Sequence, residues 1–148
     1  MKLAIGCDHG GFKLAEALRA HMKDKEIEYV DFGTHSTDSV DYPLIANQVA
    51  KAVSGGEADL GVLVCSTGIG ISIAANKVKG IRAAVVTNEL CAELTRRDND
   101  SNILCMGGKV VDEETAVKIF DTFVNTRFDG GRHARRVGQI TDIEAGRL

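Results

Sequence analysis

A chain of 148 residues, of which 44% are hydrophobic, is long enough to fold as one domain around a buried core. Its formal net charge of −3 and its aromatic content of 5% argue against a nucleic-acid partner, which needs a basic surface and stacking rings. No apolar run is as long as a membrane span, so we expect no membrane association.

The amino terminus and the cysteines indicate the cellular compartment. The first residues are typical of a strand that turns polar at Asp8, which is unlike a secretory signal peptide. The four cysteines, at positions 7, 65, 91 and 105, have no CxxC spacing and predict neither a disulfide framework nor a zinc site. We therefore expect a cytoplasmic protein that binds no metal.

Short apolar runs alternate with amphipathic segments along the whole chain. Strands are predicted at residues 3–7, 28–32, 60–64, 81–86 and 103–106. Helices are predicted at residues 12–23, from 43 to about 53, from about 71 to a stop at Lys79-Gly80, at 89–97 and at 113–125. A basic tail starts near residue 127 and is expected to be helical from about His133.

This alternation predicts an α/β fold with a doubly wound, five-stranded parallel sheet, in the form of a Rossmann-like three-layer sandwich. We expect a single domain over residues 1–148, because the chain has no low-complexity segment and no internal repeat. Right-handed crossovers place the carboxyl ends of the strands at one edge of the sheet, where ligands bind in such folds.

The segment Cys65-Ser66-Thr67-Gly68-Ile69-Gly70 joins the third predicted strand to the following helix. Two glycines at such a turn leave backbone N–H groups accessible, and a helix N-terminus behind them attracts an anion or a developing oxyanion. A thiol and a hydroxyl stand at the mouth of the turn, which makes it a candidate reaction centre. The alternative is an inert buried cysteine beside an ordinary turn.

Asp8 and His9 follow the first predicted strand. We expect them to face the same crevice as Cys65, together with the segment after the fourth strand, because parallel strand ends meet at one edge. The alternative is a turn aspartate followed by a surface histidine.

Two further polar segments leave both interpretations open. Residues 96–102 precede a strand, so they form either a solvated loop or part of the crevice. In the tail, Arg132 and Arg136 would share one helix face, which suits a phosphate dianion. The alternative is a solvated basic helix end, or one that contacts an acidic protein surface.

Six segments in consistent order and spacing resemble the ribose-5-phosphate isomerase B family, which includes galactose-6-phosphate and allose-6-phosphate isomerases. The segments are Gly6-Cys7-Asp8-His9, Asp41-Tyr42-Pro43, Cys65-Ser66-Thr67-Gly68-Ile69-Gly70, Ala74-Ala75-Asn76-Lys77, Gly80-Ile81-Arg82-Ala83 and Gly130-Gly131-Arg132-His133. The resemblance covers nearly the whole chain.

The resemblance implies an enzyme that interconverts aldose and ketose phosphates through an enediolate, without a metal or cofactor. Cys65 matches the family's base, and Ile71 stands where some members carry a glutamate base instead. The amides from Ser66 to Gly70 match the family's anion hole. Thr67 matches a hydroxyl that assists opening of the sugar ring.

The resemblance also implies contacts to substrate. Asp8 matches a residue that holds sugar hydroxyls, and Asn99 matches an amide contact. The remaining matches are phosphate ligands: His9, Arg132 and Arg136, with Lys109 in place of a further arginine. The family site is built between two subunits, so the resemblance implies a homodimer or a tetramer.

Two positions depart from the family pattern. Ser66 stands where glycine is usual, and Asp98 stands where the ring-opening histidine is expected. The resemblance implies ribose 5-phosphate as the first candidate substrate. The departure at Asp98 leaves open a hexose 6-phosphate, such as allose 6-phosphate or galactose 6-phosphate. A non-catalytic, flavodoxin-like module that binds a phosphorylated ligand is the alternative from another class. A mononucleotide-binding domain is disfavoured, because the glycine turn follows the third strand and not the first.

Overall fold

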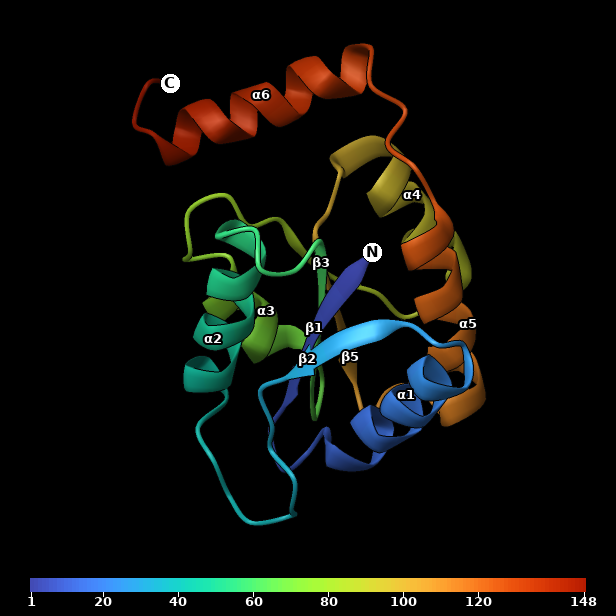
Figure 1. Cartoon of the computed structure of the whole chain (residues 1–148). Helices are drawn as coiled ribbons and strands as arrows, with labels where there is room; N and C mark the ends of the chain where they lie inside the picture. Colours follow the sequence, from blue (N-terminus) through green and yellow to red (C-terminus); the bar gives the residue numbers. More distant parts are fainter.

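The structure is a computed structural model that describes residues 1–148, and a sheet of five parallel strands lies at its centre (Figure 1). The strands are β1 (Lys2–Cys7), β2 (Glu28–Asp31), β3 (Leu60–Cys65), β4 (Ala83–Val85) and β5 (Ile103–Gly107), in the order β2-β1-β3-β5-β4. The helices are α1 (Phe12–Asp24), α2 (Tyr42–Ser54), α3 (Ile69–Ala75), α4 (Glu89–Asn99), α5 (Glu113–Asn125) and α6 (Arg132–Glu144). All strand pairs are parallel, which confirms the predicted α/β class.

Helices cover both faces of the sheet because successive side chains of each strand point to opposite sides. On one face Leu3 and Ile5 of β1 pack with α1 and α5, where Phe120 and Phe123 are fully buried. On the other face Ala4 packs with α2 and α3. This double cover explains why β3 is buried along its whole length and is apolar without alternation.

The predicted strand 81–86 is the element that changes most. Its ordered part is β4, a three-residue strand at the edge of the sheet. Just before it, the N–H of Arg82 donates to Oδ1 of Asn102 at 2.8 Å instead of joining the strand ladder. The fourth strand is therefore a short edge strand, and β5 lies between it and β3.

The helix α6 stands apart from the two layers, beyond the amino ends of the strands (Figure 1). It lies against α4, and Glu144 accepts a hydrogen bond from Gly80 N–H at 2.9 Å. None of its residues is buried, and Ile140 and Ile143 are exposed. No helix of the chain has the length and apolar character that crossing a membrane requires.

Candidate active site

The turn after β3 has the geometry of an anion-binding loop. Gly68 has a φ of 81°, and a Cβ there would lie 2.9 Å from the carbonyl carbon of Met106, so only glycine fits. In this conformation Gly68 N–H donates to Sγ of Cys65 at 3.1 Å, and Ile69 N–H donates to Oγ1 of Thr67 at 3.2 Å. The turn therefore places a backbone donor directly on the Cys65 sulfur.

The end of β5 locks this turn in place. Gly108 N–H donates to the carbonyl oxygen of Cys65 at 2.8 Å, and Lys109 N–H donates to that of Ser66 at 2.9 Å. A Cβ on Gly107 would lie 2.5 Å from the carbonyl carbon of Thr67, so the two backbones touch. Lys109, which the family resemblance matches to a phosphate ligand, therefore lies beside the glycine turn.

Asp8 and His9 lie at the same edge of the sheet as the turn. Asp8 N–H donates to the carbonyl oxygen of Val64 at 3.1 Å, which ties the end of β1 to the end of β3. The Asp8 carboxylate accepts N–H groups of Gly10 and Gly11 at 2.9 and 3.1 Å, both through Oδ1. Asp8 is therefore a turn aspartate that still has Oδ2 available for a ligand.

Two side chains lie close to glycines of this edge. The hydroxyl of Ser66 occupies the space that a Cβ on Gly10 would need. The ring of Tyr42 lies over Gly70, where a Cβ would be 2.8 Å from Cζ. Tyr42 was not among the predicted site residues, although it belongs to one of the six matching segments; only the tertiary packing shows it beside the turn.

The thiols differ in their surroundings. Burial raises the pKa of the Cys105 thiol strongly, and the neighbouring Cys65 adds to that rise. Burial also raises the pKa of Cys7, although Arg19 beside it opposes the shift. Cys91 is exposed on α4. Cys65 is the thiol that combines a strand end with a hydrogen bond from a glycine turn, which supports it as the reactive one.

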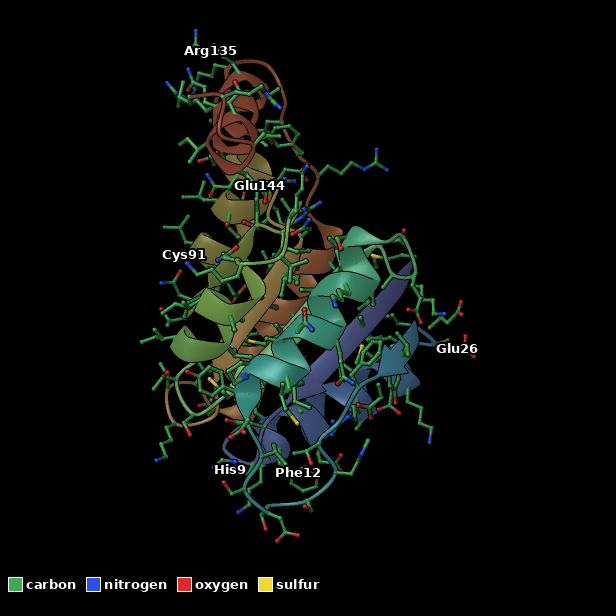
Figure 2. All side chains as sticks on the ribbon, turned by 90° about the vertical axis from the view of Figure 1, so that its left-hand side faces the viewer. His9, Phe12, Glu26, Cys91, Arg135 and Glu144 are labelled. Atoms are coloured by element: carbon green, nitrogen blue, oxygen red, sulfur yellow. The ribbon has the colours of Figure 1, made fainter.

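The other predicted site residues lie at the opposite end of the molecule. Asp98 and Asn99 end α4, which runs back toward the amino ends of the strands, and Arg132 and Arg136 are on α6. Figure 2 shows this separation, with His9 at one end and Arg135 at the other. The predicted site residues therefore fall into two separate groups, and one chain does not bring Asp98, Asn99 or the two arginines to Cys65.

The group around Asp98 has its own contacts between α4 and the tail. Nε2 of His133 lies 3.5 Å from Oδ1 of Asp98, and Asp129 lies within 4.8 Å of both. These donor types can hold a divalent metal, but Nε of Arg97 already pairs with Asp129 at 3.0 Å. The cluster therefore reads as an ion-pair network that links α4 to the start of α6.

The chain is similar to known isomerases over nearly its full length. The ribose/galactose isomerase family matches residues 3–140. The ribose-5-phosphate isomerase B of Escherichia coli strain K12 is 50% identical over 143 residues, which cover 97% of this chain and 96% of that protein. The solved structure of ribose-5-phosphate isomerase B from Clostridium thermocellum is 51% identical, with a TM-score of 0.98 and 100% coverage of both chains.

A further solved structure carries a ligand. The ribose-5-phosphate isomerase B of Mycoplasma genitalium, with bound ribulose-5-phosphate, is 40% identical with a TM-score of 0.92, over 97% of this chain and 96% of that one. The resemblance seen in the six sequence segments is confirmed by these matches. With its parallel sheet, its glycine turn at Cys65 and a family match from residue 3 to 140, the chain belongs to the ribose/galactose isomerase family.

Proposed function

We propose that the chain is an aldose–ketose isomerase that interconverts ribose 5-phosphate and ribulose 5-phosphate through an enediolate. The observation that carries the proposal is the hydrogen bond from Gly68 N–H to Sγ of Cys65, at 3.1 Å, in the glycine turn that leads into α3. The names of the Escherichia coli and Clostridium thermocellum relatives and the ribulose-5-phosphate bound to the Mycoplasma genitalium protein support the choice of sugar.

The chemistry needs one base and one set of oxyanion donors. As a thiolate, Cys65 removes the proton from C2 of the open aldose, and the electron pair moves onto the C1 carbonyl oxygen. The turn amides donate hydrogen bonds to the resulting enediolate oxygen. The hydroxyl on C2 then passes its proton to the oxyanion on C1, and the thiol returns its proton to carbon C1, which leaves the ketose with its C2 carbonyl and C1 hydroxyl. These steps use only groups of the chain, so the proposal includes no metal or cofactor.

We propose that the two groups of residues, one around Cys65 and one on α4 and α6, are two half-sites that each contribute substrate contacts. In the first, Asp8 would hold sugar hydroxyls through its free Oδ2, and His9 and Lys109 would reach the phosphate. In the second, the guanidinium groups of Arg132 and Arg136 are exposed and make no hydrogen bond or ion pair within the chain. Such unpaired cations suit a phosphate dianion.

We propose that a homodimer joins the two half-sites, with each site formed by both chains. Support comes from apolar side chains that the chain leaves exposed on neighbouring elements: Ile69 and Ile73 of α3, Val85 of β4, Leu90 and Leu94 of α4, and Ile140 and Ile143 of α6. Between α6 and the body lies a groove of about 490 Å³, lined in part by Ile140 and Ile143. A second copy would cover the unpaired edge of β4 and this groove.

Mixing two impaired variants tests the shared site, provided that ribose 5-phosphate is kept well below the raised KM of Arg132→Ala. Cys65→Ala and Arg132→Ala damage opposite half-sites, so a mixed dimer has one site with both lesions and one site that is intact. We expect random pairing of equal amounts to restore about a quarter of the wild-type activity, from half of the dimers with one site each. Co-expressed chains with two different tags would be purified and assayed. If both half-sites belonged to one chain, mixing would restore nothing.

Ring opening is the step where the chain departs from its family. A cyclic sugar phosphate must lose the proton of its anomeric hydroxyl and gain one on the ring oxygen before C2 can react. Histidine can serve either task near neutral pH, whereas an ionised aspartate only accepts a proton. We propose that Asp98 accepts the anomeric proton and that Thr67 or water serves the ring oxygen. The same departure keeps a hexose 6-phosphate as the second candidate substrate.

Replacing Asp98 by histidine is expected to raise kcat/KM for ribose 5-phosphate by roughly tenfold, because a general acid and base then assists ring opening. Erythrose 4-phosphate is the matched reference, since its phosphorylated hydroxyl cannot close a furanose ring. Steady-state rates of Asp98→His with both aldoses give the comparison. An equal change with the cyclic and the open aldose would show that Asp98 takes no part in ring opening.

The function itself is tested by a coupled assay across pentose 5-phosphates and hexose 6-phosphates. We expect the highest kcat/KM with ribose 5-phosphate. A higher value with a hexose phosphate would change the assigned substrate and keep the reaction class. Binding of these sugars without turnover of any would support the non-catalytic alternative. We place the enzyme in the cytoplasm, where its free cysteines would stay reduced.

A further inference from the structure

The last turn of α4 is held by contacts that the proposed chemistry does not require. Asp100 follows the last residue of α4 as its C-cap. Its backbone has φ 47° and ψ 43°, which is the left-handed conformation. Helices usually end on glycine or asparagine in this conformation, because a side chain is disfavoured there. The groups around Asp100 must therefore stabilise the aspartate in this conformation.

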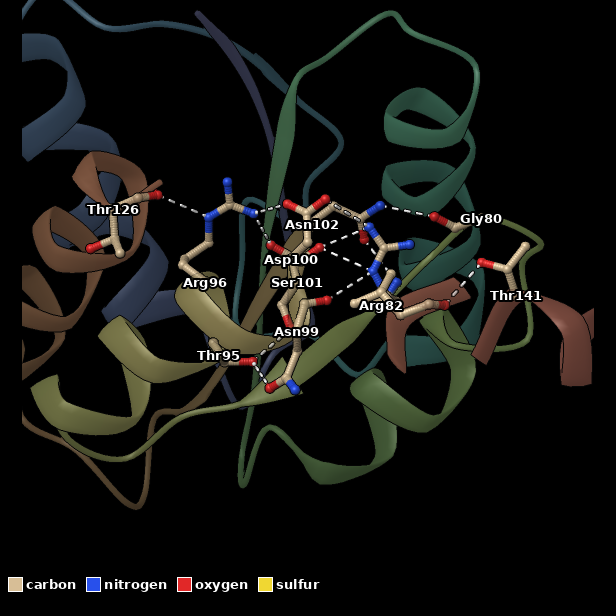
Figure 3. Close-up of polar contacts among 11 residues, drawn as sticks. Gly80, Arg82, Thr95, Arg96, Asn99, Asp100, Ser101, Asn102, Thr126 and Thr141 are labelled. Carbon is tan, nitrogen blue, oxygen red and sulfur yellow. Dashed lines mark hydrogen bonds and ion pairs between the residues drawn. The ribbon is translucent and has the colours of Figure 1, made fainter. Parts of the chain in front are cut away.

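Arg82 and Arg96 bind Asp100 from opposite sides, an arrangement that we call the clamp (Figure 3). Arg82, which precedes β4, donates to the backbone oxygen of Asp100 through Nε and Nη2 at 3.1 and 2.9 Å. The same guanidinium nitrogen, Nη2, also lies 3.3 Å from Oδ2 of the Asp100 carboxylate. Arg96 of α4 donates from Nη1 to the other carboxylate oxygen at 3.1 Å and to the carbonyl oxygen of Ser101.

The clamp extends to Asn99. Nε of Arg82 also donates to the backbone oxygen of Asn99, at 3.0 Å. Arg82 thus satisfies carbonyl groups at the end of a helix, where a cation is electrostatically favoured. The hydroxyl of Thr95 donates to Oδ1 of the Asn99 side chain at 3.2 Å, and it lies 2.6 Å from the hydroxyl of Ser101. With its oxygen occupied, Asn99 presents its side-chain NH2 group as a free donor.

The two arginines are themselves anchored outside α4. The side chains of Arg82 and Arg96 are 22% and 13% exposed, so water screens these ion pairs less than it screens surface pairs. Arg96 also donates from Nε to the carbonyl oxygen of Thr126, and its guanidinium lies 5.5 Å from the ring centre of Phe123. Asp100 therefore connects the end of α4 to β4 on one side and to α5 on the other.

We propose that Asp100, clamped between Arg82 and Arg96, is a positioning residue that fixes Asp98 and Asn99 for the sugar. The inference rests on the proposed function, in which Asp98 accepts the anomeric proton, and on the family resemblance, which gives Asn99 an amide contact to the sugar. Without the clamp the last turn of α4 frays, and both side chains leave the orientation that the sugar requires. Small displacements of positioning groups have large effects on turnover. The turn at Cys65 lies at the other end of the same chain and keeps its own hydrogen bonds.

Asp100→Asn is the main test, because asparagine tolerates the left-handed conformation but removes both ion pairs. Asp142→Asn is the matched control: it removes a two-bond pair with Arg147, outside the proposed site. We expect Asp100→Asn to raise KM for ribose 5-phosphate by about tenfold, since supporting contacts typically carry effects of that size. We expect the control to leave KM unchanged, and the rate of Cys65 alkylation by iodoacetamide to stay at the wild-type value in both.

Hydrogen–deuterium exchange gives a readout that does not depend on activity. We expect faster exchange over residues 95–102 in Asp100→Asn and not in Asp142→Asn. Arg82→Lys provides a second variant, because lysine keeps the charge but cannot bridge the carbonyl groups of Asn99 and Asp100. If Asp100→Asn exchanges faster over residues 95–102 but keeps its KM, Asp100 has a structural role only. A kcat that falls in proportion to the folded fraction would lead to the same conclusion. If exchange over residues 95–102 is unchanged in Asp100→Asn and in Arg82→Lys, the clamp does not hold the end of α4, whichever sugar the wild type uses.

Discussion

Replacement of Cys65 by alanine is expected to lower kcat for ribose 5-phosphate by on the order of 10²–10⁴-fold, the usual contribution of a positioned base. The expectation follows from the hydrogen bond that Gly68 N–H donates to Sγ and from Ile71, which offers no carboxylate as a substitute. The substrate dissociation constant, measured by calorimetry, should change little, since the turn amides and the phosphate ligands remain.

Cys91→Ala is the control for the loss of a thiol, because Cys91 is exposed on α4 and has no proposed role. Its kcat should equal that of the wild type. The decisive measurement is the coupled isomerase assay on purified Cys65→Ala, with thermal unfolding to confirm that the variant is folded. Activity within a few-fold of the wild type would mean that another group is the base.

Loss of the tail arginines is expected to weaken recognition of the phosphate. Arg132→Ala or Arg136→Ala should each cost roughly 1.5–3 kcal/mol, the typical contribution of a charge-assisted hydrogen bond. Because these contacts are made to substrate and transition state alike, the loss should appear mainly as a higher KM. Neither guanidinium has a partner within the chain, so little structural disturbance is expected.

Arg135→Ala is the matched control, since it removes the same charge from the same helix at a position outside the predicted pair. The KM values of the three variants for ribose 5-phosphate would be compared at fixed ionic strength. We expect only a small rise for Arg135→Ala. The wild type should also turn over free ribose far less efficiently than ribose 5-phosphate; equal efficiency would contradict a phosphate site on α6.

Much of the first half-site could be predicted from local sequence. The apolar run before Cys65 and the glycines after it specify a buried strand followed by an open turn, because burial and backbone freedom are encoded residue by residue. Parallel strand ends share one edge, so the ends of β1 and β3 could be expected to lie side by side, as the Asp8–Val64 hydrogen bond shows. Tyr42 escaped prediction because its position over Gly70 depends on the packing of α2 against α3.

The second half-site shows the opposite case. The spacing of Arg132 and Arg136 predicts a shared helix face, but nothing local says at which end of the sheet that helix lies. The direction of α4 and the path of the tail decide that these arginines, with Asp98 and Asn99, lie away from Cys65. The grip of Arg82 and Arg96 on Asp100 likewise joins residues that are close only after β4 and α4 have packed.

The sequence by itself determined the α/β class, the elements in order and the glycine turn after the third strand, because hydrophobic periodicity and glycine conformations act over a few residues. Tertiary structure alone decided that the fourth strand is a short edge strand and that burial raises the pKa of the Cys105 thiol. It alone separated the two half-sites and left apolar side chains of α3, α4 and α6 exposed. These outcomes depend on which distant surfaces meet, and such contacts are set by the packing of whole elements and not by any single segment.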